Sequence, residues 1–132
     1  MLFLKSYIAG LIAFLVIDYI WLKYVALTFY RSNIGHLMTD TPNLAVAGLF
    51  YLFYVVGVVI LAVNPALEKQ SWMIALCYGG LLGFVAYGTY DITNLATLKN
   101  FPPIVAIVDM IWGTVLTASV ATISYFVSAA LR

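Results

Sequence analysis

Charged residues are scarce in this sequence. Only 8% of its 132 residues are Asp, Glu, Lys or Arg, whereas about a quarter is usual for a soluble domain. The net charge is +1, so nothing in the bulk charge indicates a nucleic-acid partner or the recruitment of an acidic ligand, and we expect no nucleic acid as a partner. At this length the chain has room for one domain.

Cysteine and histidine each occur once. The single Cys77 excludes a disulfide within the chain and a thiolate metal site. It lies in an apolar run, where we expect it to be a small buried hydrophobe. The lone His36 leaves no histidine cluster for haem or di-iron chemistry. We therefore expect neither a cofactor nor a bound metal.

Hydrophobic residues are abundant instead, at 65% of the total. They form four runs, about 6–28, 44–63, 72–95 and 103–129, and a helix of about 20 residues crosses the hydrocarbon of a bilayer. The first run lacks a small-residue cleavage site, so we expect a retained span rather than a signal peptide. The sequence predicts an all-α integral membrane protein, a four-helix antiparallel bundle with residues 1–132 as a single transmembrane domain.

The orientation in the membrane stays open. Lys5, Lys69 and Arg132 lie on one side of the predicted bundle, and Lys23, Arg31 and Lys99 lie on the other. The positive-inside rule gives no decision between three basic residues and three. The terminal amine beside Lys5 favours a cytoplasmic N-terminus, and dual insertion is an alternative.

Three aspartates lie inside the predicted spans, where a carboxylate is costly and normally faces the bundle interior, a partner or water. Asp18 is in the second half of the first span, Asp91 is near the end of the third, and Asp109 is early in the fourth. Because successive spans alternate in direction, all three lie in the half of the membrane next to the first and third loops. The sequence therefore predicts one shared polar site in that half.

The first and fourth spans repeat one spacing, in VIDYIW and IVDMIW. In each, a tryptophan follows an aspartate by three residues and lies on the same helix face. An indole can donate a hydrogen bond to a carboxylate, and its ring can form an apolar or cation-binding wall. We expect a ligand-binding site made of Asp18, Trp21, Tyr30, Arg31, His36, Tyr87, Tyr90, Asp91, Asn94, Asp109 and Trp112.

These residues also have a purely structural interpretation. The embedded aspartates could be protonated or hydrogen-bonded contacts between helices, Asp91 could mark the end of its helix, and the tyrosines could form an interfacial belt. The matching depth of three acids beneath polar loops favours a functional site. Separately, Gly79 and Gly83 form a GxxxG pair, which predicts a close helix contact along the third span.

Four short motifs resemble an uncharacterised bacterial family of predicted four-helix membrane proteins: YDITNLATL, the DMIWG of the fourth span, the D-x-x-W of the first span and the FYR…GHL after it. The similarity extends over nearly the whole chain. It implies an integral protein of a bacterial inner membrane, without an established activity. The family motifs fall on Asp18, Trp21, Tyr30, Arg31, Gly35, His36, Tyr90, Asp91, Thr93, Asn94, Asp109 and Trp112.

Three functions remain open. The first is the binding or translocation of a small cationic or amphipathic ligand or a lipid headgroup. The second is an interfacial lipid-modifying enzyme, in which Asp91 would be a general base or a ligand of Mg²⁺ or Mn²⁺ and His36 would carry protons; no catalytic residue is assigned. The third is an accessory subunit of a larger membrane complex. The bilayer is a partner in all three, and a homo-oligomer is an alternative to a monomer.

Overall fold

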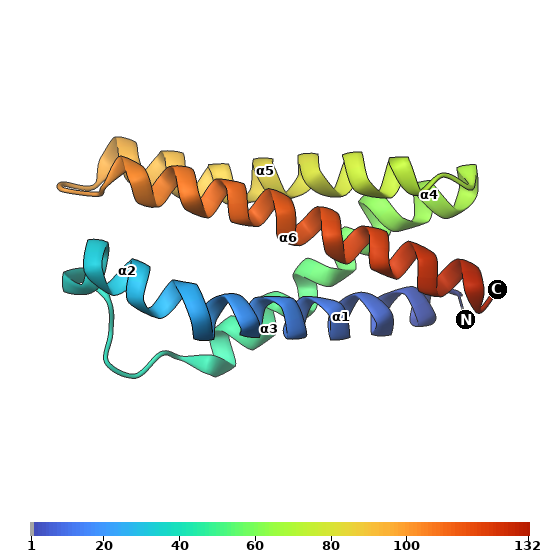
Figure 1. The fold of residues 1–132 in the computed structure, drawn as a ribbon, viewed down its shortest axis with the longest axis horizontal. Helices are drawn as coiled ribbons and strands as arrows, with labels where there is room; N and C mark the ends of the chain where they lie inside the picture. Colours follow the sequence, from blue (N-terminus) through green and yellow to red (C-terminus); the bar gives the residue numbers. More distant parts are fainter. Residues whose placement is uncertain (1) are drawn as a thin grey trace.

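The computed structural model describes residues 2–132, and within them the chain is helical, with no strand. Four helices are long and apolar enough to cross a membrane: Leu2–Leu37, Leu44–Lys69, Trp72–Thr97 and Pro103–Ala130. The prediction of an all-α protein with four spans is confirmed. Figure 1 shows both termini at one end of the molecule, the terminus end, and the α5–α6 connection at the opposite end, the loop end.

The first helix extends beyond the predicted end of its span at residue 28. It consists of α1 (Leu2–Trp21), a π-helical turn (Leu22–Ala26), α2 (Leu27–Ile34) and a 3-10 turn (Gly35–Leu37). The sequence predicts a loop after residue 28 because the segment is polar. Instead, Ser32 and Asn33 donate side-chain hydrogen bonds of 2.8 Å to the carbonyl oxygens of Thr28 and Phe29. These polar side chains are satisfied within the helix, so the helix continues.

The second helix also continues past its predicted end. It contains α3 (Leu44–Val58), a second π-helical turn (Val59–Val63) and α4 (Asn64–Lys69). Pro65 lies in the first turn of α4, and the wide π-helical turn directly before it accommodates the proline ring. In Figure 1 this helix crosses the molecule obliquely: α3 begins beside α1, and the π turn and α4 pack against α5.

The closest helix contact joins α5 (Trp72–Thr97) to α6 (Pro103–Ala130). A Cβ atom at Gly83 would overlap the carbonyl oxygen of Gly113, and one at Gly79 would lie 2.8 Å from the Cβ of Ala121. Only glycine permits this approach of two backbones, so the contact predicted from the GxxxG pair is confirmed.

The apolar core occupies the terminus end of the molecule. Its fully buried side chains come from all four spans and include Phe14, Val55, Val58, Val59, Val63, Ala75, Leu116 and Val120. A smaller cluster lies at the loop end, where Phe101, Val105 and Ala106 pack against Phe29, Tyr30 and Ile34. The buried aspartates lie between these two clusters.

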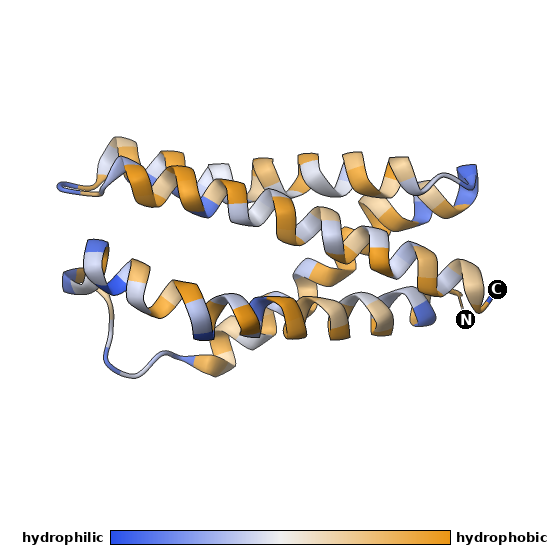
Figure 2. Ribbon diagram, viewed as in Figure 1, coloured by the Kyte–Doolittle hydropathy of each residue, from blue (hydrophilic) through white to orange (hydrophobic). Residues whose placement is uncertain are grey.

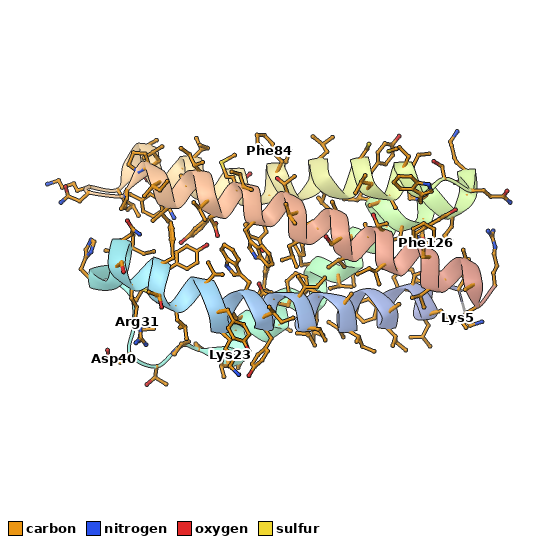
Figure 3. All side chains as sticks on the ribbon, in the orientation of Figure 1. Lys5, Lys23, Arg31, Asp40, Phe84 and Phe126 are labelled. Carbon is orange, nitrogen blue, oxygen red and sulfur yellow. The ribbon has the colours of Figure 1, made fainter. Side chains whose placement is uncertain are left out.

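The outer faces of the helices expose many large apolar side chains. Figure 2 shows hydrophobic residues along the length of the helices. Phe84 of α5 and Phe126 of α6 point outward and are 52% exposed (Figure 3). Cys77 is exposed on α5 as well, so its predicted burial inside the protein is wrong. An apolar outer face is what a bilayer solvates, which is why a small hydrophobe at this position does not need the core.

Candidate functional site

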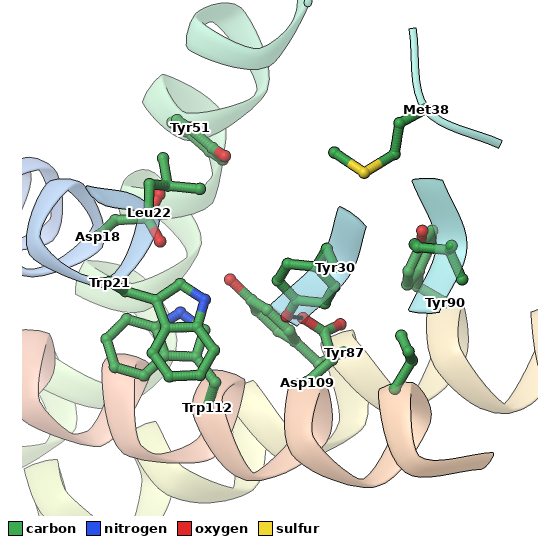
Figure 4. A pocket seen from close by; sticks show the side chains of 12 residues that line it. Asp18, Trp21, Leu22, Tyr30, Met38, Tyr51, Tyr87, Tyr90, Asp109 and Trp112 are labelled. Carbon is green, nitrogen blue, oxygen red and sulfur yellow. Dashed lines mark hydrogen bonds between the residues drawn. The ribbon is translucent and has the colours of Figure 1, made fainter. Parts of the chain in front are cut away.

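A cavity of about 330 Å³ lies between the two apolar clusters, and every span contributes to its walls (Figure 4). It is lined by Asp18 and Trp21 of α1, Leu22 of the first π turn, Tyr30 and Ile34 of α2, Met38, Tyr51 of α3, Tyr87 and Tyr90 of α5, and Val105, Asp109 and Trp112 of α6. Its size is typical of a small-molecule site.

The two Asp-x-x-Trp motifs meet face to face in this cavity. The indole rings of Trp21 and Trp112 are stacked, with centroids 4.3 Å apart and an interplanar angle of 8°. The side chain of Trp112 and the Asp18 carboxyl of the facing helix line the same cavity. The shared spacing therefore builds one wall from two helices, with a flat aromatic surface beside a carboxylate.

Asp109 is held by a phenol from the other side of the cavity. The hydroxyl of Tyr30 donates to Asp109 Oδ1 at 2.6 Å, a length typical of an O–H bond to a charged acceptor. This bond links α2 to the first turns of α6. It fixes one oxygen of the carboxylate and leaves the group on the cavity wall.

Tyr87 reaches the cavity because α6 carries a glycine opposite it. A Cβ atom at Gly113 would overlap the Tyr87 ring, so the phenol lies directly against the α6 backbone. The neighbouring ring of Tyr54 meets Tyr87 edge-on, with centroids 6.4 Å apart. The position of this phenol is thus fixed by packing on both faces.

Asp91 lies behind the cavity wall and is fully buried, with 0% of its surface exposed. Within residues 2–132 no donor reaches either of its carboxyl oxygens. Its acidic neighbour is Asp109 of α6, whose carboxyl when ionised can only accept. Two such acids side by side need one proton or a cation between them, since an unpaired buried charge is very costly.

Basic residues are missing from the walls of this cavity. Among the described residues that line it there are two aspartates and no Lys, Arg or His. Arg31 and His36, which the sequence places in the same site, are exposed on the helix beyond it and do not line it. The reason is the helical continuation of the first span, which carries these side chains on its outer face instead of in a loop folded over the acids.

The structure brings together most of the remaining predicted residues. Asp18, Trp21, Tyr30, Tyr87, Tyr90, Asp109 and Trp112 line the cavity, and Asp91 lies next to Asp109. Asn94 is half-buried one turn after Asp91, within reach of the Tyr90 side chain, and does not line the cavity. A role for these residues in binding stays a prediction.

Some of the lining residues carry no sequence signal. Leu22, Ile34, Met38 and Val105 are apolar residues that look like any others in such a chain. Tyr51 could have been found, because it and Tyr54 are the polar side chains of an otherwise apolar second span. A phenol in a charge-free span indicates a polar neighbour, which here is the acid cavity.

The donor set does not favour a metal site. Over residues 2–132, no three side chains among His, Cys, Asp and Glu converge as metal ligands. The cavity instead combines two carboxylates with aromatic rings. Such a combination can bind an organic cation through its charge and through the ring faces.

Residues 3–126 match the sequence pattern of a family described as predicted membrane proteins (DUF2177), and the chain belongs to this family. The function of the family is unknown. Comparison with curated proteins found no match, and comparison with solved structures found none either.

Proposed function

We propose that this member of the DUF2177 family binds a small cationic molecule, or the cationic headgroup of an amphipathic one, in the cavity between its two apolar clusters. One observation carries the proposal: Asp18 and Asp109 line an aromatic cavity whose described walls contain no basic residue. A positive ligand would supply the missing countercharge. The stacked indoles and the phenols would contact its alkyl groups by cation–π attraction.

Binding is better supported than translocation. Towards the terminus end the hydroxyl groups inside the bundle are already paired with one another: Tyr54 with Thr117 at 2.7 Å, Ser6 with Ser128 at 2.8 Å. Thr117 and Ser128 are completely buried among the core residues. A polar ligand leaving in that direction would have to break these contacts and cross the packed core.

Catalysis has less support than binding. His36, the expected proton carrier, is exposed outside the cavity, and Asp91 is sealed behind the cavity wall. A general base must reach the proton that it removes, within a hydrogen-bond length or through one water. We place the protein in a bacterial inner membrane on the strength of the motif resemblance.

The test is equilibrium dialysis of radiolabelled tetramethylammonium against the full chain in dodecyl maltoside micelles. We expect saturable binding that weakens about tenfold or more in Asp109→Asn and in Asp18→Asn, because each variant removes one countercharge. Asp40→Asn is the matched control, since Asp40 is exposed at the same end but lies outside the cavity. Equal binding by all four proteins, or by none of them, would contradict the proposal.

A further inference from the structure

A second cavity, of about 460 Å³, lies beside the acid cavity and between α3 and α5. Its walls are Phe14, Ala47, Phe50, Tyr51, Tyr54, Ala86, Tyr87, Tyr90 and Asp109. Tyr51, Tyr87, Tyr90 and Asp109 also line the acid cavity, so the two spaces share one wall. We call this second space the α3–α5 groove. It extends the acid cavity sideways, across the bundle.

The α3–α5 groove is apolar away from the shared wall. Phe14, Ala47, Phe50 and Ala86 present only hydrocarbon or aromatic carbon. The one other hydroxyl, that of Tyr54, is paired with Thr117 at 2.7 Å and is not free for a ligand. Chemically, the two spaces together have a charged end and an apolar end.

The groove exists because the second helix crosses the molecule obliquely. Its later part, the π turn and α4, packs against α5, while the first half of α3 lies beside α1 (Figure 1). The gap between α3 and α5 therefore widens from the terminus end towards the acids. Phe50 and Tyr90, on its two sides, are 62% and 55% exposed on the outer face of the bundle. In a membrane that face contacts lipid chains.

The route from water is less favourable for a polar ligand. The wall of the acid cavity nearest the loop end is formed by Ile34, Met38 and Val105. Val105 belongs to the apolar cluster in which Phe101 packs against Phe29 of α2. The polar side chains of Arg31 and His36 lie outside this wall. A ligand that arrives through the α3–α5 groove meets the acids without crossing it.

We propose that the ligand is a single-chain cationic amphiphile taken laterally from the bilayer, with its positive headgroup between Asp18 and Asp109 and its chain in the α3–α5 groove. This inference rests on the proposed function and adds the class of molecule and the direction from which it comes. Charge complementarity selects the headgroup end, and the shared wall of Tyr51, Tyr87 and Tyr90 fixes where headgroup and chain join.

The outer surface supplies a control for ordinary lipid contact. Another apolar groove on α5 is lined by Leu61, Tyr78, Leu81, Leu82 and Val85, and no acid lies on it. Val85 is adjacent in sequence to Ala86 and 54% exposed, but it lines this acid-free groove. Val85→Phe and Ala86→Phe thus place the same ring on the same helix. Only Ala86→Phe places it in the α3–α5 groove, which leads to the acids.

The experiment compares tetramethylammonium with dodecyltrimethylammonium, both radiolabelled, on the full chain in dodecyl maltoside micelles, with binding to protein-free micelles subtracted. We expect the dodecyl compound to bind about tenfold or more tightly. Ala86→Phe should abolish that gain and leave tetramethylammonium binding unchanged, while Val85→Phe should alter neither. Ala47→Phe, on the opposite wall, repeats the test if Ala86→Phe does not fold.

The outcomes separate the two proposals. Tetramethylammonium binding that depends on Asp109, without any gain from the chain, would overturn the amphiphile inference and leave the cation site standing. Failure of both compounds to bind would overturn both. Equal losses in Ala86→Phe and Val85→Phe would show unspecific chain contact and overturn the inference. A dimer that dissociates on Ala86→Phe would assign the α3–α5 groove to a second copy of the chain and would also overturn the inference.

Discussion

The two ends of this bundle are built on opposite principles. At the terminus end, the described side chains interdigitate and their buried hydroxyls are paired: Ser6 with Ser128 at 2.8 Å, and Ser124 with the Ser6 carbonyl at 2.7 Å. At the loop end, helices diverge around a cavity, and the buried acid Asp91 has no donor within residues 2–132.

The difference shows how a chain this small can maintain an unfavourable site. An unpaired acid in hydrocarbon costs free energy, so the rest of the fold has to be more stable than the site alone would allow. The close α5–α6 contact and the core at the terminus end provide that stability. The residues that stabilise the fold and the residues proposed to bind a ligand therefore lie at different places along the long axis of the bundle. Substitutions in these two regions should change the free energy of unfolding in opposite directions.

The largest expected effect is the loss of close packing at the terminus end. Gly79→Ala places a methyl group 2.8 Å from the Cβ of Ala121 and 2.9 Å from the carbonyl oxygen of Thr117, so α5 and α6 must move apart. We expect the free energy of unfolding to fall by about 3 kcal/mol, measured by SDS titration in mixed micelles with far-UV circular dichroism. Gly57→Ala is the control, because a Cβ there has no neighbour within 4 Å. Equal results for the two variants would show that the close contact does not hold the bundle.

An increase in the free energy of unfolding is expected from a substitution beside the acid cavity. Asp91→Asn introduces an amide that can donate to Asp109 without an extra proton. We expect the free energy of unfolding of the ligand-free protein to rise by about 1 kcal/mol in the same titration. Asp40→Asn, at an exposed position, should leave it unchanged. If Asp91→Asn proves destabilising, Asp91 is a structural contact and the contrast between the two ends fails.

The smallest effect is expected from the paired serines. Ser128→Ala removes the partner of Ser6, and hydrogen bonds between membrane helices contribute about 0.6 kcal/mol on average. A double-mutant cycle with Ser6→Ala in the same titration isolates the pair. We expect a coupling energy of that size. A coupling energy of zero would mean that the terminus end is stabilised by side-chain packing alone.

Much of the fold could be predicted from the sequence, because lipid leaves the backbone of a long apolar run no alternative to a helix. A common depth for the three aspartates was predicted from the alternation of the spans. The structure places Asp18 and Asp109 on one cavity and Asp91 next to Asp109. The helix ends did not follow. A polar segment such as RSNIGH is typical of a loop. In the structure, however, the side chains of Ser32 and Asn33 donate hydrogen bonds to carbonyl oxygens of the preceding helical turn.

The shape of the candidate site could not be predicted from the sequence, because it depends on how the helices cross. Asp18, Trp21, Asp109 and Trp112 carried a repeated spacing, and the structure stacks their indoles. The α3–α5 groove, in contrast, depends on the oblique course of the second helix. Nothing in the sequence around Ala47, Phe50 or Ala86 predicts it. Spacing reports what one helix presents on one face. It does not report the angle at which two helices cross.

The wide turn at Leu22–Ala26 sets the angular phase of everything that follows it in the first helix. The N–H of Leu27 bonds to the Leu22 carbonyl, five residues back, so the turn holds one residue more than an α-helical turn does. Tyr30 lies twelve positions after Asp18; in an uninterrupted α-helix the two would point about 120° apart, and the extra residue reduces this to about 20°. Both line the same cavity. One residue of this turn is therefore equivalent to an insertion, and its deletion would keep the two side chains in phase. A deletion elsewhere between them that left the wide turn intact would rotate the phenol away from the acids.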